Sequence, residues 1–354
     1  MLEQKLLPLF GMHRYEESEP KHSRIEYRMD FKDQYGKWKE EIDNRLGNLV
    51  EDREPRSLYE PVEHILAGEG KRIRAVLLLL SCKAVGGSID KALEAALSVE
   101  ILHNFTLVHD DIMDKAATRR GRQTVHTKWD EGTAILVGDV MIGLAQQLLL
   151  KNAGGNCAAA IDAFSRGIID VCEGQALDRE FEQRNDVTTE EYLYMIAMKT
   201  GRLVEMAAEI GGLIGGGKPE HINALRAYAR KLGLAFQIQD DLLDLIADEK
   251  QLGKEIGRDI IEGKRTYLVV QGIELVAEGK DRELLEQLLS GPGLPANQVE
   301  VARTMFQKCG ILDKARQEVE RYCVDALKDL EILPDSEART MLKWFSEMLM
   351  RREN

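Results

Sequence analysis

Proline is scarce in this chain, with eight among its 354 residues. Because proline interrupts helices, its scarcity is compatible with many long ones. Segments that alternate apolar and polar residues between turn residues are rare, whereas apolar residues often recur three, four and seven positions apart. That spacing is typical of amphipathic helices, so the sequence predicts an all-α protein.

The sequence also lacks an excess of positive charge and paired cysteines. Its formal net charge is −13, which argues against a protein that binds nucleic acid through a basic surface. The same charge suits a site built from carboxylates that attracts metal cations. The five cysteines show no CxxC spacing, so we interpret them as reduced thiols of a cytosolic protein.

Long apolar runs are missing too. No run reaches the roughly 20 residues that span a bilayer, and residues 1–20 carry acids and proline, unlike a secretory signal. We therefore expect a cytoplasmic protein without stable membrane insertion. Residues 1–33 are charged and weakly periodic and are predicted to form a loose N-terminal extension. Residues 34–354 contain no long linker and are predicted to form a single helical domain.

Two acidic motifs with D-D-x-x-D spacing follow apolar stretches that are expected to be helices, over 88–114 and 218–248. The first contains Asp110, Asp111 and Asp114, and the second contains Asp240, Asp241 and Asp244. On a helix, the first and last aspartate of such a motif lie on one face, about one turn apart. Like charges at this spacing repel unless a cation shares them, and burying them unpaired costs several kcal/mol, by order of magnitude.

This pattern predicts that the two helices run side by side and that their carboxylates face a divalent metal across a gap. Ligands that are all oxygen suit a hard ion, above all Mg²⁺. A single acidic motif at a helix end is as easily explained by a solvated surface. Two such motifs, each after an apolar stretch and each followed by basic residues, favour the metal site.

Basic residues cluster at two glycine-containing turns. Lys71, Arg72 and Arg74 belong to "GKRIR", and Arg119 and Arg120 precede Gly121. Arginine matches phosphate oxygens with two parallel hydrogen bonds, and lysine supplies a point charge. Alone, such a cluster is usually a solvated surface patch; beside two acidic motifs it favours phosphate binding. The phosphates could belong to one metal-bound diphosphate or to two diphosphates in separate subsites.

Taken together, these motifs resemble those of the trans-isoprenyl diphosphate synthases (polyprenyl synthetases), most of all the short-chain geranylgeranyl and farnesyl diphosphate synthases. The motifs are, in order, "GKRIR", "LVHDDIMD", "RRGRQTVH", "GTAILVGD", "GQALD", "KTG", "FQIQDDLLD", "LGKEIGRD" and "GKRT". Two positions depart from the family pattern: Ala75 replaces a common proline, and Ala247 replaces a usual glycine. Neither position supplies a ligand atom.

The resemblance implies a bundle of long, mostly antiparallel helices around a deep central cavity, usually as a homodimer. It implies a prenyltransferase that condenses isopentenyl diphosphate head to tail with an allylic diphosphate. About three Mg²⁺ per active site would assist, with Mn²⁺ as a possible substitute.

The resemblance also implies roles for individual residues. Asp110, Asp114 and Asp240 would ligate the metal, supported by Asp111, Asp241 and Asp244. Arg119, Lys199, Lys254 and Lys264 would bind the allylic diphosphate. Lys71, Arg74, His103 and Arg120 would bind isopentenyl diphosphate. Lys199, Thr200 and Gln237 would be catalytic, with Thr200 and Gln237 facing the reacting carbons, and Gln175 and Asp178 would lie at the rim.

The histidines need separate interpretation. His103 lies seven residues before Asp110 on the same helical face. A lone histidine on an apolar helix is more often a core residue, but the family position favours a diphosphate contact. His109 and His126 are interpreted as structural or as neighbours of the site.

Product length is predicted from the residues about one turn before Asp110. There the family resemblance gives Phe105 the role of a floor that stops the growing prenyl chain, with Thr106 beside it. No two-residue insertion interrupts the first acidic motif. We expect geranylgeranyl diphosphate (C20) as product, with farnesyl diphosphate (C15) or a longer product as the alternative.

Two other classes remain as alternatives. A terpene cyclase-like lyase or a phosphohydrolase of similar build usually needs one acidic motif of this kind. A non-catalytic partner subunit is expected to lack one motif. Both motifs are intact here, which favours the transferase.

Overall fold

The computed structural model describes residues 21–152, 156–246, 257–291 and 293–351. Its helices in the first half of the chain are α2 (Lys21–Gly47), α3 (Arg56–Leu66), α4 (Ile73–Ala84), α5 (Ile89–Met113), α6 (Val125–Lys128), α7 (Glu131–Asn152) and α8 (Cys157–Phe181). Those that follow are α9 (Thr189–Ile196), α10 (Arg202–Ile214), α11 (Pro219–Ile246), α13 (Arg258–Ile261), α14 (Tyr267–Leu275), α15 (Lys280–Ser290), α16 (Val299–Lys308), α17 (Ile311–Asp329) and α18 (Glu337–Arg351).

Short elements complete the description. The 3₁₀ turns are Ala296–Gln298 and Leu330–Ile332, and the strands β1 (Thr118–Arg119) and β2 (Arg122–Gln123) pair antiparallel. This two-stranded hairpin is the whole β structure of the described residues. The predicted all-α fold is therefore confirmed.

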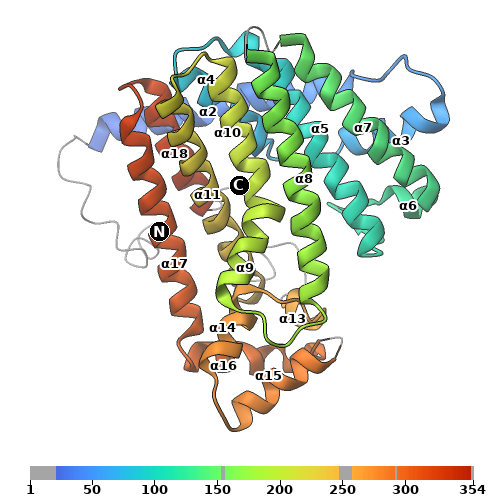
Figure 1. Cartoon of the computed structure of the whole chain (residues 1–354), viewed down its shortest axis with the longest axis vertical. Coiled ribbons are helices and arrows are strands. Elements are labelled where there is room, and N and C mark those ends of the chain that lie inside the picture. Colours follow the sequence, from blue (N-terminus) through green and yellow to red (C-terminus); the bar gives the residue numbers. More distant parts are fainter. Residues whose placement is uncertain (1–20, 153–155, 247–256, 292, 352–354) are drawn as a thin grey trace.

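The long helices form one bundle, with a smaller group of helices, α13 to α16, at one end (Figure 1). In the bundle α5 packs against α4 and α7, α10 packs against α4, α8 and α11, and α11 packs against α17. The helices that carry the two acidic motifs, α5 and α11, both contact α10. The deep central cavity that the family resemblance implies stays a prediction.

The helices that carry the motifs begin close to where the sequence places them. Ser88 is the N-cap of α5, and the last aspartate of the first acidic motif, Asp114, is its C-cap. Thr188 begins α9 with a capping box, in which its hydroxyl accepts from the Glu191 backbone and the Glu191 carboxylate accepts from the Thr188 backbone. This reciprocal pair satisfies two amide hydrogens that the first turn leaves open.

The segment after Thr188 is not one continuous α-helix. A π-helical segment, Ala197–Gly201, separates α9 from α10. Such wide turns are rare and often occur at functional sites. Here the turn contains Lys199 and Thr200, two of the residues expected to be catalytic.

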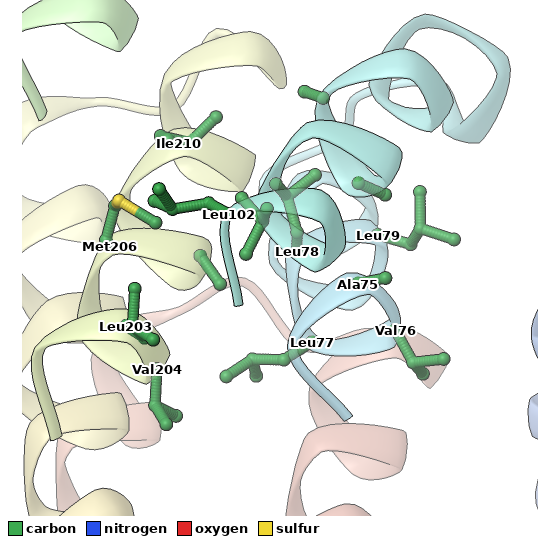
Figure 2. Close-up of a cluster of buried hydrophobic side chains, with 14 of the residues drawn as sticks. Ala75, Val76, Leu77, Leu78, Leu79, Leu102, Leu203, Val204, Met206 and Ile210 are labelled. Atoms are coloured by element: carbon green, nitrogen blue, oxygen red, sulfur yellow. The ribbon is translucent and has the colours of Figure 1, made fainter. Parts of the chain in front are cut away.

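Buried apolar side chains form two clusters, which we call the upper and lower clusters after their places in Figure 1. In the upper cluster, Leu78 of α4, Leu102 of α5 and Met206 of α10 gather in the space between α4 and α10 (Figure 2). The lower cluster joins α9 and the second half of α11 to helices α14 to α17. Along α11 the change from upper to lower falls between Leu232 and Leu234.

The N-terminal and C-terminal helices lie together. Helix α2 begins at Lys21 and passes through residue 33, where the sequence suggests the end of an extension. Phe31 is buried and lies against Trp344 of α18, with ring centroids 6.1 Å apart. The division of the chain at residue 33 stays a prediction, and residues 1–20 lie outside the described residues.

Candidate active site

The first acidic motif ends helix α5. Asp111 is buried, and its Oδ1 accepts a hydrogen bond from Nε of Arg119 at 2.7 Å. Asp114 is exposed and Asp110 is half-buried. Burial, reinforced by the neighbouring charge of Asp114, raises the pKa of Asp110 to about 6, although Lys199 and Arg119 oppose this shift. Asp110 therefore holds its negative charge weakly unless further positive charge comes close.

The second acidic motif lies near the end of α11, and its three aspartates differ in burial. Asp240 and Asp244 are half-buried, and Oδ2 of Asp244 accepts from the Asp259 backbone at 3.1 Å. Asp241 is buried and accepts three hydrogen bonds: from the Tyr192 hydroxyl, from Nε2 of Gln237 at 3.0 Å, and from the Tyr267 backbone at 2.8 Å. Burial, despite these donors, raises the pKa of Asp241 to about 7.

A hydrogen-bonded chain connects the second motif to the π-helical segment. The hydroxyl of Thr200 donates to Oε1 of Gln237 at 3.0 Å, and Gln237 in turn donates to Asp241. Because Asp241 fixes which end of the Gln237 amide carries the nitrogen, the amide oxygen faces Thr200. The buried Tyr192 completes this chain from the side of α9.

Lys199, the residue before Thr200, acts on the first motif through its charge instead. Its Nζ donates to the Asp178 carboxylate, and its charge lowers the pKa of Asp110. Burial opposes the charge of Lys264, but the charges of Asp259 and Glu262, and to a smaller extent that of Asp114, raise the pKa of Lys264. The two neighbouring residues of the π-helical segment therefore interact with different acidic motifs: Thr200 with the second motif through Gln237, and Lys199 with the first through its charge.

Close approach of the backbones holds the π-helical segment between α8 and α11. A Cβ on Gly174 would lie 2.4 Å from the backbone nitrogen of Lys199. A Cβ on Gly233 of α11 would lie 2.8 Å from Cα of Gly201. Both glycines stand in segments that the sequence analysis singled out, "GQALD" and the helix over 218–248, but sequence alone did not assign them this role.

The two acidic motifs supply the donor atoms for the predicted metal. Among the described residues, no three acidic, histidine or cysteine side chains converge closely enough to form a metal cluster. The donors of the two acidic motifs are nonetheless all carboxylate oxygens, which suit a hard divalent cation. The raised pKa of Asp110 also fits a position that is completed by a cation. The residues therefore fit Mg²⁺ by their chemistry.

The basic residues from "GKRIR" and "RRGRQ" come together around His103 of α5. Nε of Arg74 and Nδ1 of His103 are buried and have no hydrogen-bond partner within the described part of the chain. Burial, then the charges of Arg74, Arg120 and Arg119, lower the pKa of His103 well below its usual value. A cluster of cations with unsatisfied buried nitrogen atoms is suited to an anion with several oxygens.

The remaining predicted residues lie near the site or outside the described residues. Lys264 forms an ion pair with Glu262 at 3.0 Å. Oε1 of Gln175 is buried, and it has no partner among the described residues. Lys71 is exposed on the basic turn. Lys254 falls in 247–256 and so lies outside the described residues, as does Ala247.

The two residues predicted to control product length point in different directions. Thr106 is half-buried, four residues before Asp110, and its hydroxyl donates to the His103 carbonyl at 2.8 Å. Phe105 is buried, and its ring meets the edge of His109 with centroids 4.8 Å apart. His109 lies against Gly138 of α7, so Phe105 belongs to the face of α5 that packs on α7. The role of Phe105 as a floor stays a prediction.

Known proteins are similar to this chain in both sequence and fold. A family model described as polyprenyl synthetase matches residues 55–305. The short chain isoprenyl diphosphate synthase of Methanothermobacter thermautotrophicus is 40% identical over 330 residues, which are 92% of this chain and 100% of the relative. The geranylgeranyl diphosphate synthase of Methanosarcina mazei is 37% identical over 88% of this chain and 95% of the relative.

Among solved structures, geranylgeranyl pyrophosphate synthetase from Pyrococcus horikoshii matches with a TM-score of 0.85 and 39% identity. The match covers 92% of this chain and 100% of that one. Polyprenyl synthase from Caulobacter crescentus, complexed with calcium and isoprenyl diphosphate, matches with a TM-score of 0.83 and 27% identity, over 92% of this chain and 98% of the other. The family uses divalent metal ions. The chain therefore belongs to the polyprenyl synthetase family, as its motifs predicted, and is a trans-prenyltransferase of the short-chain type.

Proposed function

We propose that the protein condenses isopentenyl diphosphate with an allylic diphosphate and releases geranylgeranyl diphosphate, with farnesyl diphosphate as the alternative product. One observation carries the proposal. Carboxylates of the kind that bind divalent metal end helix α5, and a cluster of basic side chains surrounds His103 on the same helix. Asp110 is half-buried near Asp114 and Lys199, whereas Nε of Arg74 and Nδ1 of His103 are buried and have no partner among the described residues. Two chemically different anion sites suit two diphosphate substrates.

The carboxylate side would bind the allylic diphosphate. Asp110, Asp114 and Asp240 would hold divalent metal, with Mg²⁺ as the expected ion, which would supply positive charge for the departing diphosphate. Asp111, Asp241 and Asp244 would keep these ligands in place, as the hydrogen bonds to Asp241 suggest. Lys199, Arg119 and Lys264, together with Lys254, would add fixed cations around the leaving group.

The π-helical segment would guide the reacting carbons. Loss of diphosphate leaves an allylic carbocation, which needs electron-rich groups nearby that do not attack it. The Thr200 hydroxyl gives its hydrogen to Gln237, so its oxygen lone pairs can face the cation. The apolar clusters at both ends of the segment would help to exclude water, which would otherwise convert the cation to an alcohol.

The basic side would bind isopentenyl diphosphate. Lys71, Arg74 and Arg120 would supply the charge for its diphosphate, and His103, neutral because its pKa is low, would supply a hydrogen bond. This placement would bring the double bond of isopentenyl diphosphate toward the allylic carbon. Gln175 and Asp178 would border the opening.

The proposed C20 product rests on the relatives and on Phe105. Geranylgeranyl diphosphate synthases are among the similar proteins, and a bulky aromatic residue lies one turn and a half before Asp110 on α5. A ring in the path of the tail would limit chain growth by filling the space that further prenyl units need.

We also propose that two copies of the chain associate through α7. Within the described residues, α7 is the one helix long and apolar enough to cross a membrane, and 44% of its most apolar stretch is buried in the protein. Ile135, Leu136 and Leu150 are exposed on its outer face. A second copy would remove this apolar surface from water. Localisation in the cytoplasm stays a prediction.

The test incubates the purified protein and Mg²⁺ with labelled isopentenyl diphosphate and with each allylic primer from C5 to C15. We expect longer diphosphates, with C20 as the final product by chromatography. Cyclised or hydrolysed products from the primer alone would instead support a terpene cyclase-like lyase or a phosphohydrolase. No turnover of any primer would support a non-catalytic partner subunit.

A further inference from the structure

The basic turn 70–74 contains one arginine that faces away from the proposed diphosphate. Arg72 is buried and adopts a left-handed backbone conformation, with φ of 50°. Its Nε donates to Asp43 of α2 at 2.6 Å, and its Nη2 donates to the carbonyl of Gly68 at 2.8 Å. Because this conformation is strained for a residue with a side chain, such inward contacts are needed to hold it.

A second left-handed arginine closes the turn from the other side. Arg120 has φ of 52°, and its Nη1 donates to the carbonyl of Glu69 at 2.8 Å. A Cβ on Gly70 would lie 3.1 Å from a terminal nitrogen of both Arg72 and Arg120. The two guanidinium groups therefore crowd one glycine, although their charges repel. A turn built in this way needs support from outside itself.

That support comes from α2, which lies outside the stretch that the family model matches. Its Tyr35 donates a hydrogen bond from the hydroxyl to the backbone carbonyl of Lys71. The Tyr35 ring is held in turn by α18, where Trp344 and Phe345 lie with ring centroids 6.3 Å away. The contact from Asp43 to Arg72 comes from the same helix, two turns later.

We propose that Tyr35 and Asp43 of α2 are positioning residues that hold the basic turn 70–74 in the shape that binds the diphosphate of isopentenyl diphosphate. Tyr35 fixes the backbone at Lys71, and Asp43 keeps Arg72 turned inward. Lys71 and Arg74, on either side of Arg72, then face the anion. The inference deepens the proposed function, on which its substrate assignment rests. It predicts that loss of these contacts weakens the binding of isopentenyl diphosphate but not that of the allylic diphosphate.

The main test is Tyr35→Phe, which removes one hydroxyl and keeps the ring between α2 and α18. We expect the KM for isopentenyl diphosphate to rise about fivefold, as loss of one hydrogen bond predicts. The KM for the allylic substrate and the melting temperature should change little. Asp43→Asn should act in the same direction. The matched control is Tyr59→Phe on α3, where the Tyr59 ring lies 5.8 Å from the Arg53 guanidinium.

A binding measurement separates this inference from the proposed function. Calorimetric titration with inorganic diphosphate, in the absence of divalent metal, should show weaker binding to Tyr35→Phe than to the unchanged protein and to Tyr59→Phe. That result would support the positioning role even if no prenyl product forms. Equal binding by all three proteins, no binding by the unchanged protein, or an equal rise of both KM values would overturn it.

Discussion

At the scale of single residues, the site depends on side chains whose partners are far apart in the sequence. Spacing alone identified the two acidic motifs and the basic turn, because like charges at such short intervals repel one another unless ions of opposite charge bind them. It could not show that Asp241 is held by Tyr192, 49 residues away, or that Tyr35 contacts a carbonyl 36 residues later. Only the fold brings such pairs together.

The hydroxyl of Thr200 provides the first residue-scale prediction. Thr200→Val keeps the shape of the side chain but removes the oxygen that would face the carbocation. We expect kcat to fall about a hundredfold, with little change in either KM, because the contact is made in the transition state. Steady-state kinetics measure this effect. Thr304→Val on α16, which removes a hydroxyl bonded to the Glu300 carbonyl, should leave kcat unchanged.

The second residue-scale prediction concerns product length. Phe105→Ala should open space beside His109 and shift the product of the purified protein toward chains longer than C20, as chromatography of extracted products would show. It should also lower stability by about 3–5 kcal/mol, as truncation of a buried phenylalanine does. Phe306→Ala, at a fully buried site in the lower cluster, is the matched control. An unchanged product would place the floor elsewhere.

At the scale of elements, the helices that carry the motifs were predictable and the wide turn between α9 and α10 was not. Apolar spacing and capping residues gave α5 and α11 nearly their observed bounds. The π-helical segment is invisible to such patterns, because the same residues could continue a regular helix. It depends on how closely α8 and α11 approach through Gly174 and Gly233.

Gly174→Ala tests this dependence. The added methyl group would lie 2.4 Å from the Lys199 backbone nitrogen, so α8 and the π-helical segment must separate. We expect a loss of about 1–3 kcal/mol of stability, as overpacking typically causes, and at least a tenfold loss of kcat. Denaturant unfolding and kinetics measure the two effects. Gly36→Ala on α2, which meets no atom within 4 Å, should be neutral or slightly stabilising.

At the scale of the whole molecule, composition and helical periodicity were enough to predict an all-helical protein. They did not reveal that the core divides into upper and lower clusters, or that Lys199 and Thr200 lie between a lower-cluster residue, Ala197, and an upper-cluster residue, Leu203. This placement has a physical reason. Apolar packing at both ends holds the π-helical segment in place, while Lys199 and Thr200 between them stay partly exposed.

The proposed association through α7 gives a prediction at this scale. Leu136 is 59% exposed on α7, and Leu136→Glu should convert a dimer to a monomer in sedimentation experiments. A carboxylate buried in an apolar interface has no partner and opposes association. Val301→Glu, at a similarly exposed site on α16, should remain dimeric. Identical sedimentation of both variants as dimers would exclude α7 as the interface.

The most direct test of the whole account is anomalous diffraction from crystals grown with Mn²⁺ and a non-reacting allylic diphosphate analogue. Mn²⁺ replaces Mg²⁺ at oxygen sites and can be located by its own signal. The account predicts metal peaks bonded to the analogue and to oxygens of both Asp110 and Asp240. Peaks that touch neither aspartate, or the two carboxylates directed apart into solvent, would contradict it.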